Sequence, residues 1–122
     1  MHRLASAAAA VLSLGSASVA HAADAVRGQE LYESRCGGCH SLDANRVGPA
    51  HRGIYGRKAG SAPSFAYSTA VKGSTLVWEE KTLDAWLTNP QAVIPGQRMN
   101  FRVALPEDRA DIIAYLRQQS GR

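Results

Sequence analysis

The sequence CGGCH occupies residues 36–40 and places two thiols and one imidazole next to each other in the chain. Such a group can carry out thiol–disulfide exchange, bind a zinc ion, or attach a haem covalently. These three chemistries make different demands on the rest of the sequence. The residues outside the motif therefore decide between them.

The first two chemistries find little support in the chain. A structural zinc site needs four ligands in tetrahedral geometry, and the only cysteines are Cys36 and Cys39. His40 or His51 would have to complete the set, but His40 directly follows Cys39, so both could hardly reach one small ion together with Cys36. A redox Cys-x-x-Cys motif normally sits beside alternating strands and helices, and the sequence shows no such alternation.

The haem chemistry agrees with the rest of the chain. Two thiols at this spacing can form thioether bonds with both vinyl groups of a porphyrin, and the histidine after the second thiol is then held against the iron. Met99 is the only methionine besides Met1, and it lies in the turn-rich stretch PGQRMNF. A thioether ligand favours ferrous iron and raises the reduction potential. We predict one haem c, bound through Cys36 and Cys39, with His40 and Met99 as axial ligands.

Two alternatives concern the second axial ligand. A lone methionine is commonly a core-filling residue, and Met99 in isolation would be assigned that role. His51 is the rival ligand, but it lies in the loop that leaves the proximal side soon after His40. We therefore expect His51 to be a surface or hydrogen-bonding histidine.

The N-terminal stretch has the three-part pattern of a secretory signal peptide. Arg3 gives a basic start, residues 4–14 are mostly apolar but too short to span a bilayer, and residues 20–22, AHA, form an A-x-A cleavage pattern. We predict that residues 1–22 are removed and that residues 23–122 form a single domain in the periplasm. No later stretch is long and apolar enough to be a transmembrane helix.

The charge of the chain limits its partners. The formal net charge is +4, from 14 basic and 10 acidic residues, which favours partners with an acidic surface. No basic patch with interleaved aromatic residues is present, so nucleic-acid binding is not expected.

Helix signals dominate the pattern, and strand signals are weak. Residues 41–72, between the first two predicted helices, are dense in Gly, Pro, Ser and Asn and are predicted to be a loop. A loop of this length is unusual in a small domain, and a large rigid cofactor would hold it. The predicted helices are residues 24–35, capped by Asp24; a helix capped by Thr82 and ended by Pro90; and residues 106–119, with Ile112, Ile113 and Leu116 as its apolar stripe.

Four segments of the chain together resemble a known family. They are GQELYESRCGGCH, GPAHRGIYGRKAGSAPSFAYS, VWEEKTLDAWLTNPQAVIPGQRM and DRADIIAYL, and their order and spacing are similar to those of the class I cytochromes c. The resemblance covers essentially the whole expected mature chain. It implies a small all-α cytochrome c fold, in which the N- and C-terminal helices cross and irregular loops wrap around one haem c. It also implies a periplasmic monohaem electron carrier, not an enzyme.

The resemblance assigns roles to particular residues. Gly28 and Tyr32 would lie where the first helix crosses the last helix at Tyr115, because glycine allows a close approach. The carbonyl group of Pro49 would accept the ring N–H of His40. The remaining cofactor contacts that it implies are the propionate donors Arg57, Tyr67 and Trp78, the aromatic Trp86 beside the methionine, and Phe101 at the exposed haem edge.

The chain also departs from the mitochondrial members of the family. His51 takes a position that is usually leucine, Trp86 one that is usually tyrosine, and Val71 one where asparagine often joins the distal hydrogen bonds. We therefore expect a more apolar distal pocket.

Three arginines, Arg35, Arg98 and Arg102, flank the motif or the ligand loop. We expect them to surround the haem edge and to attract acidic redox proteins, such as periplasmic dehydrogenases, cytochrome complexes and terminal oxidases. The expected form is a monomer. Two alternatives stay open: an electron-transfer subunit of a larger dehydrogenase or oxidase complex, and a haem peroxidase or gas sensor if Met99 can be displaced.

Overall fold

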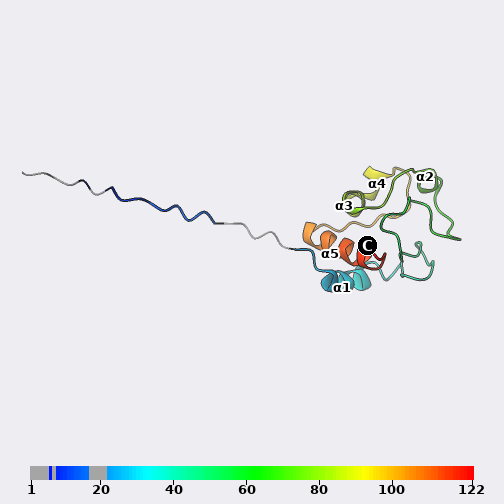
Figure 1. Ribbon diagram of the computed structural model, residues 1–122. Coiled ribbons are helices and arrows are strands. Elements are labelled where there is room, and N and C mark those ends of the chain that lie inside the picture. The colour runs from blue at the N-terminus through cyan, green and yellow to red at the C-terminus, as the bar shows by residue number, and fades with distance from the viewer. Residues whose placement is uncertain (1–5, 7, 17–21) are drawn as a thin grey trace, which may run out of the picture.

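A computed structural model describes residues 6, 8–16 and 22–122, and in it the last helix of the protein lies between two others (Figure 1). The helices are α1 (Ala25–Arg35), α2 (Thr69–Lys72), α3 (Glu80–Thr88), α4 (Pro90–Val93) and α5 (Pro106–Gln118). Within the described residues, the β-structure consists of an isolated bridge between Lys58 and Val77. The predicted all-α fold class is confirmed (Figure 1).

Helix α1 begins as the sequence predicts. The Asp24 side chain accepts hydrogen bonds from the backbone N–H groups of Val26 and Arg27, which would otherwise lack a partner at the helix start. At the other end, the carbonyl oxygen of Tyr32 accepts from the N–H groups of both Cys36 and Gly37. The end of α1 therefore positions the CGGCH turn directly.

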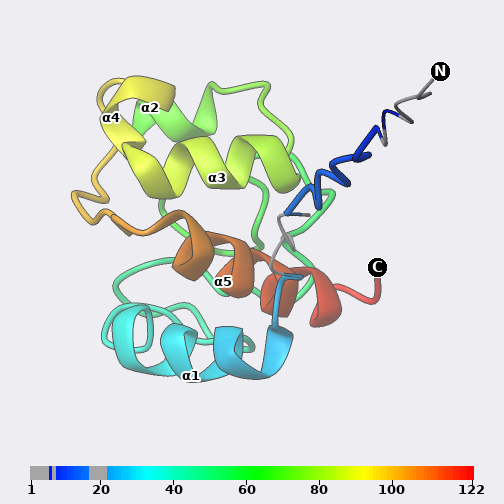
Figure 2. The ribbon, with the colours of Figure 1, turned by 90° about the vertical axis from the view of Figure 1, so that its left-hand side faces the viewer.

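Helix α1 packs against α5, and α3 lies on the other side of α5 (Figure 2). Gly28 faces the backbone of Asp111, and a Cβ atom at Gly28 would overlap the Asp111 carbonyl oxygen. Arg27 reinforces the contact, since its two terminal nitrogens lie 2.6 Å from Asp108 and 2.7 Å from Asp111. The predicted contact between the first and last helices is thus observed.

The start of the middle helix differs from the prediction. Helix α3 begins at Glu80 and Glu79 is its N-cap, so Thr82 lies within the first turn instead of capping it. Thr82 is the reciprocal partner of a capping box, because its hydroxyl oxygen accepts from the Glu79 N–H at 2.9 Å. A short helix, α2, also ends the segment that was predicted as loop. Pro90 ends α3 as expected, and it then begins α4.

The apolar core lies between α3, α5 and the loops. Its members from the two helices are Leu83, Leu87, Ile112, Ile113, Tyr115 and Leu116, all at most 6 % exposed. The apolar stripe predicted for the last helix is therefore buried.

Hydrogen bonds within the long loop help to fix it. The Asn45 side chain donates to the carbonyl of Pro63 and accepts from the N–H of Ala50.

The predicted signal peptide, residues 1–22, lies partly outside the described residues. Of its described part, Val11, Leu12 and Leu14 are 84–92 % exposed, and this part extends away from the domain (Figure 1). In the described chain, no helix combines the length and the apolar character that crossing a membrane requires.

Candidate functional site

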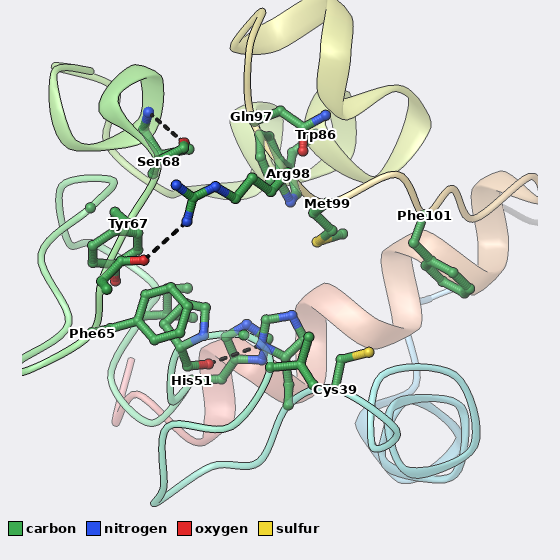
Figure 3. A pocket seen from close by; sticks show the side chains of 18 of the residues that line it. Cys39, His51, Phe65, Tyr67, Ser68, Trp86, Gln97, Arg98, Met99 and Phe101 are labelled. Atoms are coloured by element: carbon green, nitrogen blue, oxygen red, sulfur yellow. Dashed lines mark hydrogen bonds between the residues drawn. The ribbon is translucent and has the colours of Figure 1, made fainter.

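A cavity of about 610 Å³ lies among the loops, and most of the predicted site residues line it. Figure 3 shows side chains from two sides of the molecule converging on it. The predicted residues in its wall are Cys39, His40, Pro49, Tyr67, Trp78, Trp86, Arg98, Met99 and Phe101, whereas Arg57 is not among the lining residues. Cys36 lines a smaller pocket of about 110 Å³ that shares Cys39, His40 and Met99 with the cavity.

The ring of His40 has a fixed environment. Its Nδ1 atom lies 2.9 Å from the carbonyl oxygen of Pro49, which can only accept, so Nδ1 carries the proton and donates. A Cβ atom at Gly48 would overlap the ring, so glycine there leaves room for it. Burial lowers the pKa of His40 and so favours the neutral imidazole, whereas the hydrogen bond to Pro49 acts in the opposite direction. A neutral imidazole with Nε2 free is the form that binds a metal.

The two cysteines are free thiols in the structure. Cys36 packs against the core, and burial raises the pKa of its thiol to about 11, whereas Cys39 is exposed at the cavity. The backbone N–H groups of Cys39 and His40 both donate to the carbonyl oxygen of Cys36, which closes the motif into a turn. No group of three or more His, Cys, Asp or Glu residues that could hold a metal ion occurs among the described residues.

Met99 enters the cavity from the loop after α4. In Figure 3 its side chain projects into the space from one side, while Cys39 and His51 lie on the other. Helix α3 contributes Trp86 to the cavity wall. Its ring lies edge-on to that of Trp78, with 5.1 Å between centroids.

The polar groups of the cavity fit a cofactor that carries carboxylates. Arg57 does not line the cavity, but its Nε atom is buried without a hydrogen-bond partner, although its Nη2 donates to the carbonyl of Arg52. A buried cationic donor without an acceptor is rare and costly, so it points to a missing anionic group. The Tyr67 hydroxyl oxygen accepts from the N–H of Ala62 and can still donate to a carboxylate. With the apolar wall, these donors suit a haem and its propionates.

Sequence reasoning missed Gln97. It is 7 % exposed, lies in the cavity wall and has a buried Oε1 atom without a partner, while Nε2 bonds Gln91 and Asn100. Gln97 therefore adds a polar group to the cavity wall. The place of Gln97 in the sequence, two residues before Met99, was the available signal.

The three predicted docking arginines differ in their surroundings. Arg98 and Arg102 are exposed, and Phe101 between them is 41 % exposed. Arg35 lies 3.1 Å from the carboxylate of Asp108, so its charge is paired within the protein. Arg46, which sequence reasoning did not select, donates to the carbonyl groups of Gly37, Gly38 and His40 and stabilises the motif turn.

Comparisons with known proteins agree with this geometry. The sequence profile of the family described as "Cytochrome c" matches residues 25–120. The chain is 46 % identical over 97 residues to a cytochrome c of Euglena viridis, covering 77 % of this chain and 95 % of the relative. It is 47 % identical over 111 residues to a cytochrome c2 of Rhodomicrobium vannielii, covering 87 % of each. Among solved structures, cytochrome cH from Methylobacterium extorquens is similar, with a TM-score of 0.74, 38 % identity, and coverage of 78 % of this chain and 98 % of that one.

Proposed function

The chain belongs to the cytochrome c family, whose members are monohaem electron carriers that act with redox partners, and from this premise we propose that it carries single electrons between respiratory proteins in the periplasm. One observation supports the proposal above all: Met99 and the CGGCH turn line opposite sides of one cavity. The haem c, attached through Cys36 and Cys39, supplies the ferric/ferrous couple when bound.

The residues that would hold the haem iron follow from the donors on the two sides of the cavity. We propose that His40 would bind through Nε2, because Pro49 occupies the other ring nitrogen. Met99 would bind through its sulfur. With both ligands supplied by the protein, no substrate would have to bind at the iron, which is what a carrier needs.

The other cavity residues orient and shield the cofactor. We propose that Tyr67 and Trp78 bond the propionates, together with Arg57, which does not line the cavity but has a buried Nε atom without a partner, and that Trp86 packs beside Met99. Phe101 would flank the exposed edge, since it is both part of the cavity wall and 41 % exposed.

Export is part of the proposal. The exposed apolar residues Val11, Leu12 and Leu14 contribute nothing to the core, as expected for a segment that is removed. Cleavage after Ala22 would leave a monomeric domain, residues 23–122, that begins just before the Asp24 cap of α1. N-terminal sequencing of the protein from the periplasm tests this directly. A chain that retains Arg3 would contradict it.

Absorption spectra of the purified holoprotein test the central proposal. We expect a low-spin haem c spectrum in both redox states, haem that stays with the protein in acidic acetone, and ferrous protein that does not bind carbon monoxide at neutral pH. Haem extracted by acidic acetone would contradict attachment through Cys36 and Cys39. Ready carbon monoxide binding would contradict stable Met99 ligation and favour a haem peroxidase or gas sensor.

Neutralising Arg98 and Arg102 together is expected to slow electron transfer to an acidic partner roughly threefold to tenfold at low salt, because exposed charge beside the haem edge speeds association. The dependence of the rate on ionic strength should become shallower. Stopped-flow kinetics with the double glutamine variant measures both effects. Arg117→Gln is the matched control, since Arg117 lies over the Tyr55 ring instead of at the cavity. Equal rates and salt slopes in wild type and double variant would rule out steering by this pair.

A further inference from the structure

His51 lies flat against the proposed iron ligand. Its ring centroid is 3.9 Å from that of His40, and the two ring planes differ by only 20°. The two rings are therefore stacked. His51 stands where leucine is usual in the mitochondrial members of the family. Its ring thus contacts the ring of His40, the residue proposed to hold the iron.

Tyr32 fixes the orientation of His51. The Tyr32 hydroxyl lies 2.9 Å from Nδ1 of His51, and the two rings meet edge-on at 5.6 Å. The hydrogen bond and the ring contact together hold the His51 ring from the side of α1.

Tyr32 is itself held by the helix contact. It is 4 % exposed, and its ring centroid lies 5.3 Å from that of Tyr115 on α5. A continuous set of contacts therefore runs from the α1–α5 interface through Tyr32 and His51 to His40. It joins the most extensive helix contact of the domain to the ligand ring.

The stack supplies a restraint that the Pro49 bond cannot supply alone. The torsion about Cβ–Cγ of histidine has a broad energy profile, so a ring with one hydrogen bond can still rock about that bond. Gly48 leaves room for the His40 ring, and His51 covers a face of it. Groups that orient a ligating histidine also tune the metal that it binds.

On these contacts we propose that the Tyr32–His51 pair is a positioning element that sets the plane of the His40 ring, and through it the electronic structure and reduction potential of the haem iron. The inference rests on the proposed ligation by His40. It assigns a specific role to a residue that varies between this chain and the carriers it resembles. His51 acts through His40 and is not itself a ligand in this proposal.

The test compares ferric NMR spectra and reduction potentials of holoprotein variants. Tyr32→Phe removes only the hydroxyl, and His51→Leu removes the stacked ring. We expect both to shift the haem-methyl and His40 ring resonances in the same direction and to change the potential, with His51→Leu giving the larger change. Because the two residues act as a unit, the double variant should match His51→Leu alone.

Tyr115→Phe is the matched control. It removes a hydroxyl from the neighbouring buried ring and leaves the hydrogen bond between Tyr32 and His51 intact. The stability of the protein can therefore change, while the haem-methyl and His40 resonances and the reduction potential should not. Unchanged resonances and potential in both Tyr32→Phe and His51→Leu would overturn the inference. If wild type itself lacked a low-spin spectrum with histidine and methionine ligands, the proposed function would fail instead, so the two failures are distinguishable.

Discussion

Replacing Met99 with alanine is expected to abolish the sulfur–iron absorption band of the ferric protein and to lower the reduction potential. Met99 is the proposed distal ligand, and a thioether stabilises ferrous iron. Axial ligands shift haem potentials over a range of about 0.8 V, so a fall on the order of 0.1 V or more is expected. The ferrous variant should also bind carbon monoxide readily. Potentiometry and absorption spectroscopy of the holoprotein measure all three effects.

Arg98→Ala provides the control for this change. Arg98 precedes Met99 in the same loop and is exposed, with one long contact of 3.5 Å to the carbonyl of Ala66. The control should keep the absorption band and exclude carbon monoxide. A Met99→Ala protein with an unchanged band would show that another side chain is the ligand, and His51 would then be the first residue to test.

The site was largely predictable because its donors lie in short local patterns. The thiols and imidazole of CGGCH are close in the chain, so their shared chemistry can be inferred without a fold. Met99 could be inferred because it is the only methionine after Met1 and lies in a turn. The Pro49 contact came from the resemblance, and the hydrogen bond to His40 is present in the structure.

Other features depend on contacts between residues far apart in the chain, and the sequence does not encode them locally. The stacking of His51 on His40 and its bond to Tyr32 require α1 and the loop to be placed relative to each other. The ion pair between Arg35 and Asp108 likewise depends on the packing of α1 against α5. The start of α3 was misplaced for another reason, since Thr82 has a capping role from within the helix.

Replacing Gly28 with alanine is expected to destabilise the protein, although helix propensity alone predicts the opposite. In an exposed helix, glycine to alanine would stabilise by about 1 kcal/mol. Gly28 is buried, however, and a Cβ there would overlap the backbone carbonyl oxygen of Asp111 and lie 3.1 Å from the Cβ of Tyr115. A backbone carbonyl cannot swing aside as a flexible side chain can, so α1 and α5 would have to separate. Overpacking of this kind costs about 1–3 kcal/mol or more.

Thermal unfolding of the holoprotein, followed by far-ultraviolet circular dichroism, decides between these two effects. If packing dominates, a cost of about 3 kcal/mol less the propensity gain of about 1 kcal/mol leaves a net loss of about 2 kcal/mol, which lowers the midpoint by roughly 10 °C in a domain of this size. Glu30→Ala is the control, because Glu30 is an exposed residue of the same helix. A midpoint for Gly28→Ala at or above that of wild type would mean that α1 and α5 can separate at little cost. In that case the helix contact could not hold Tyr32 firmly enough to orient His51, so this measurement also bears on the positioning of the ligand ring.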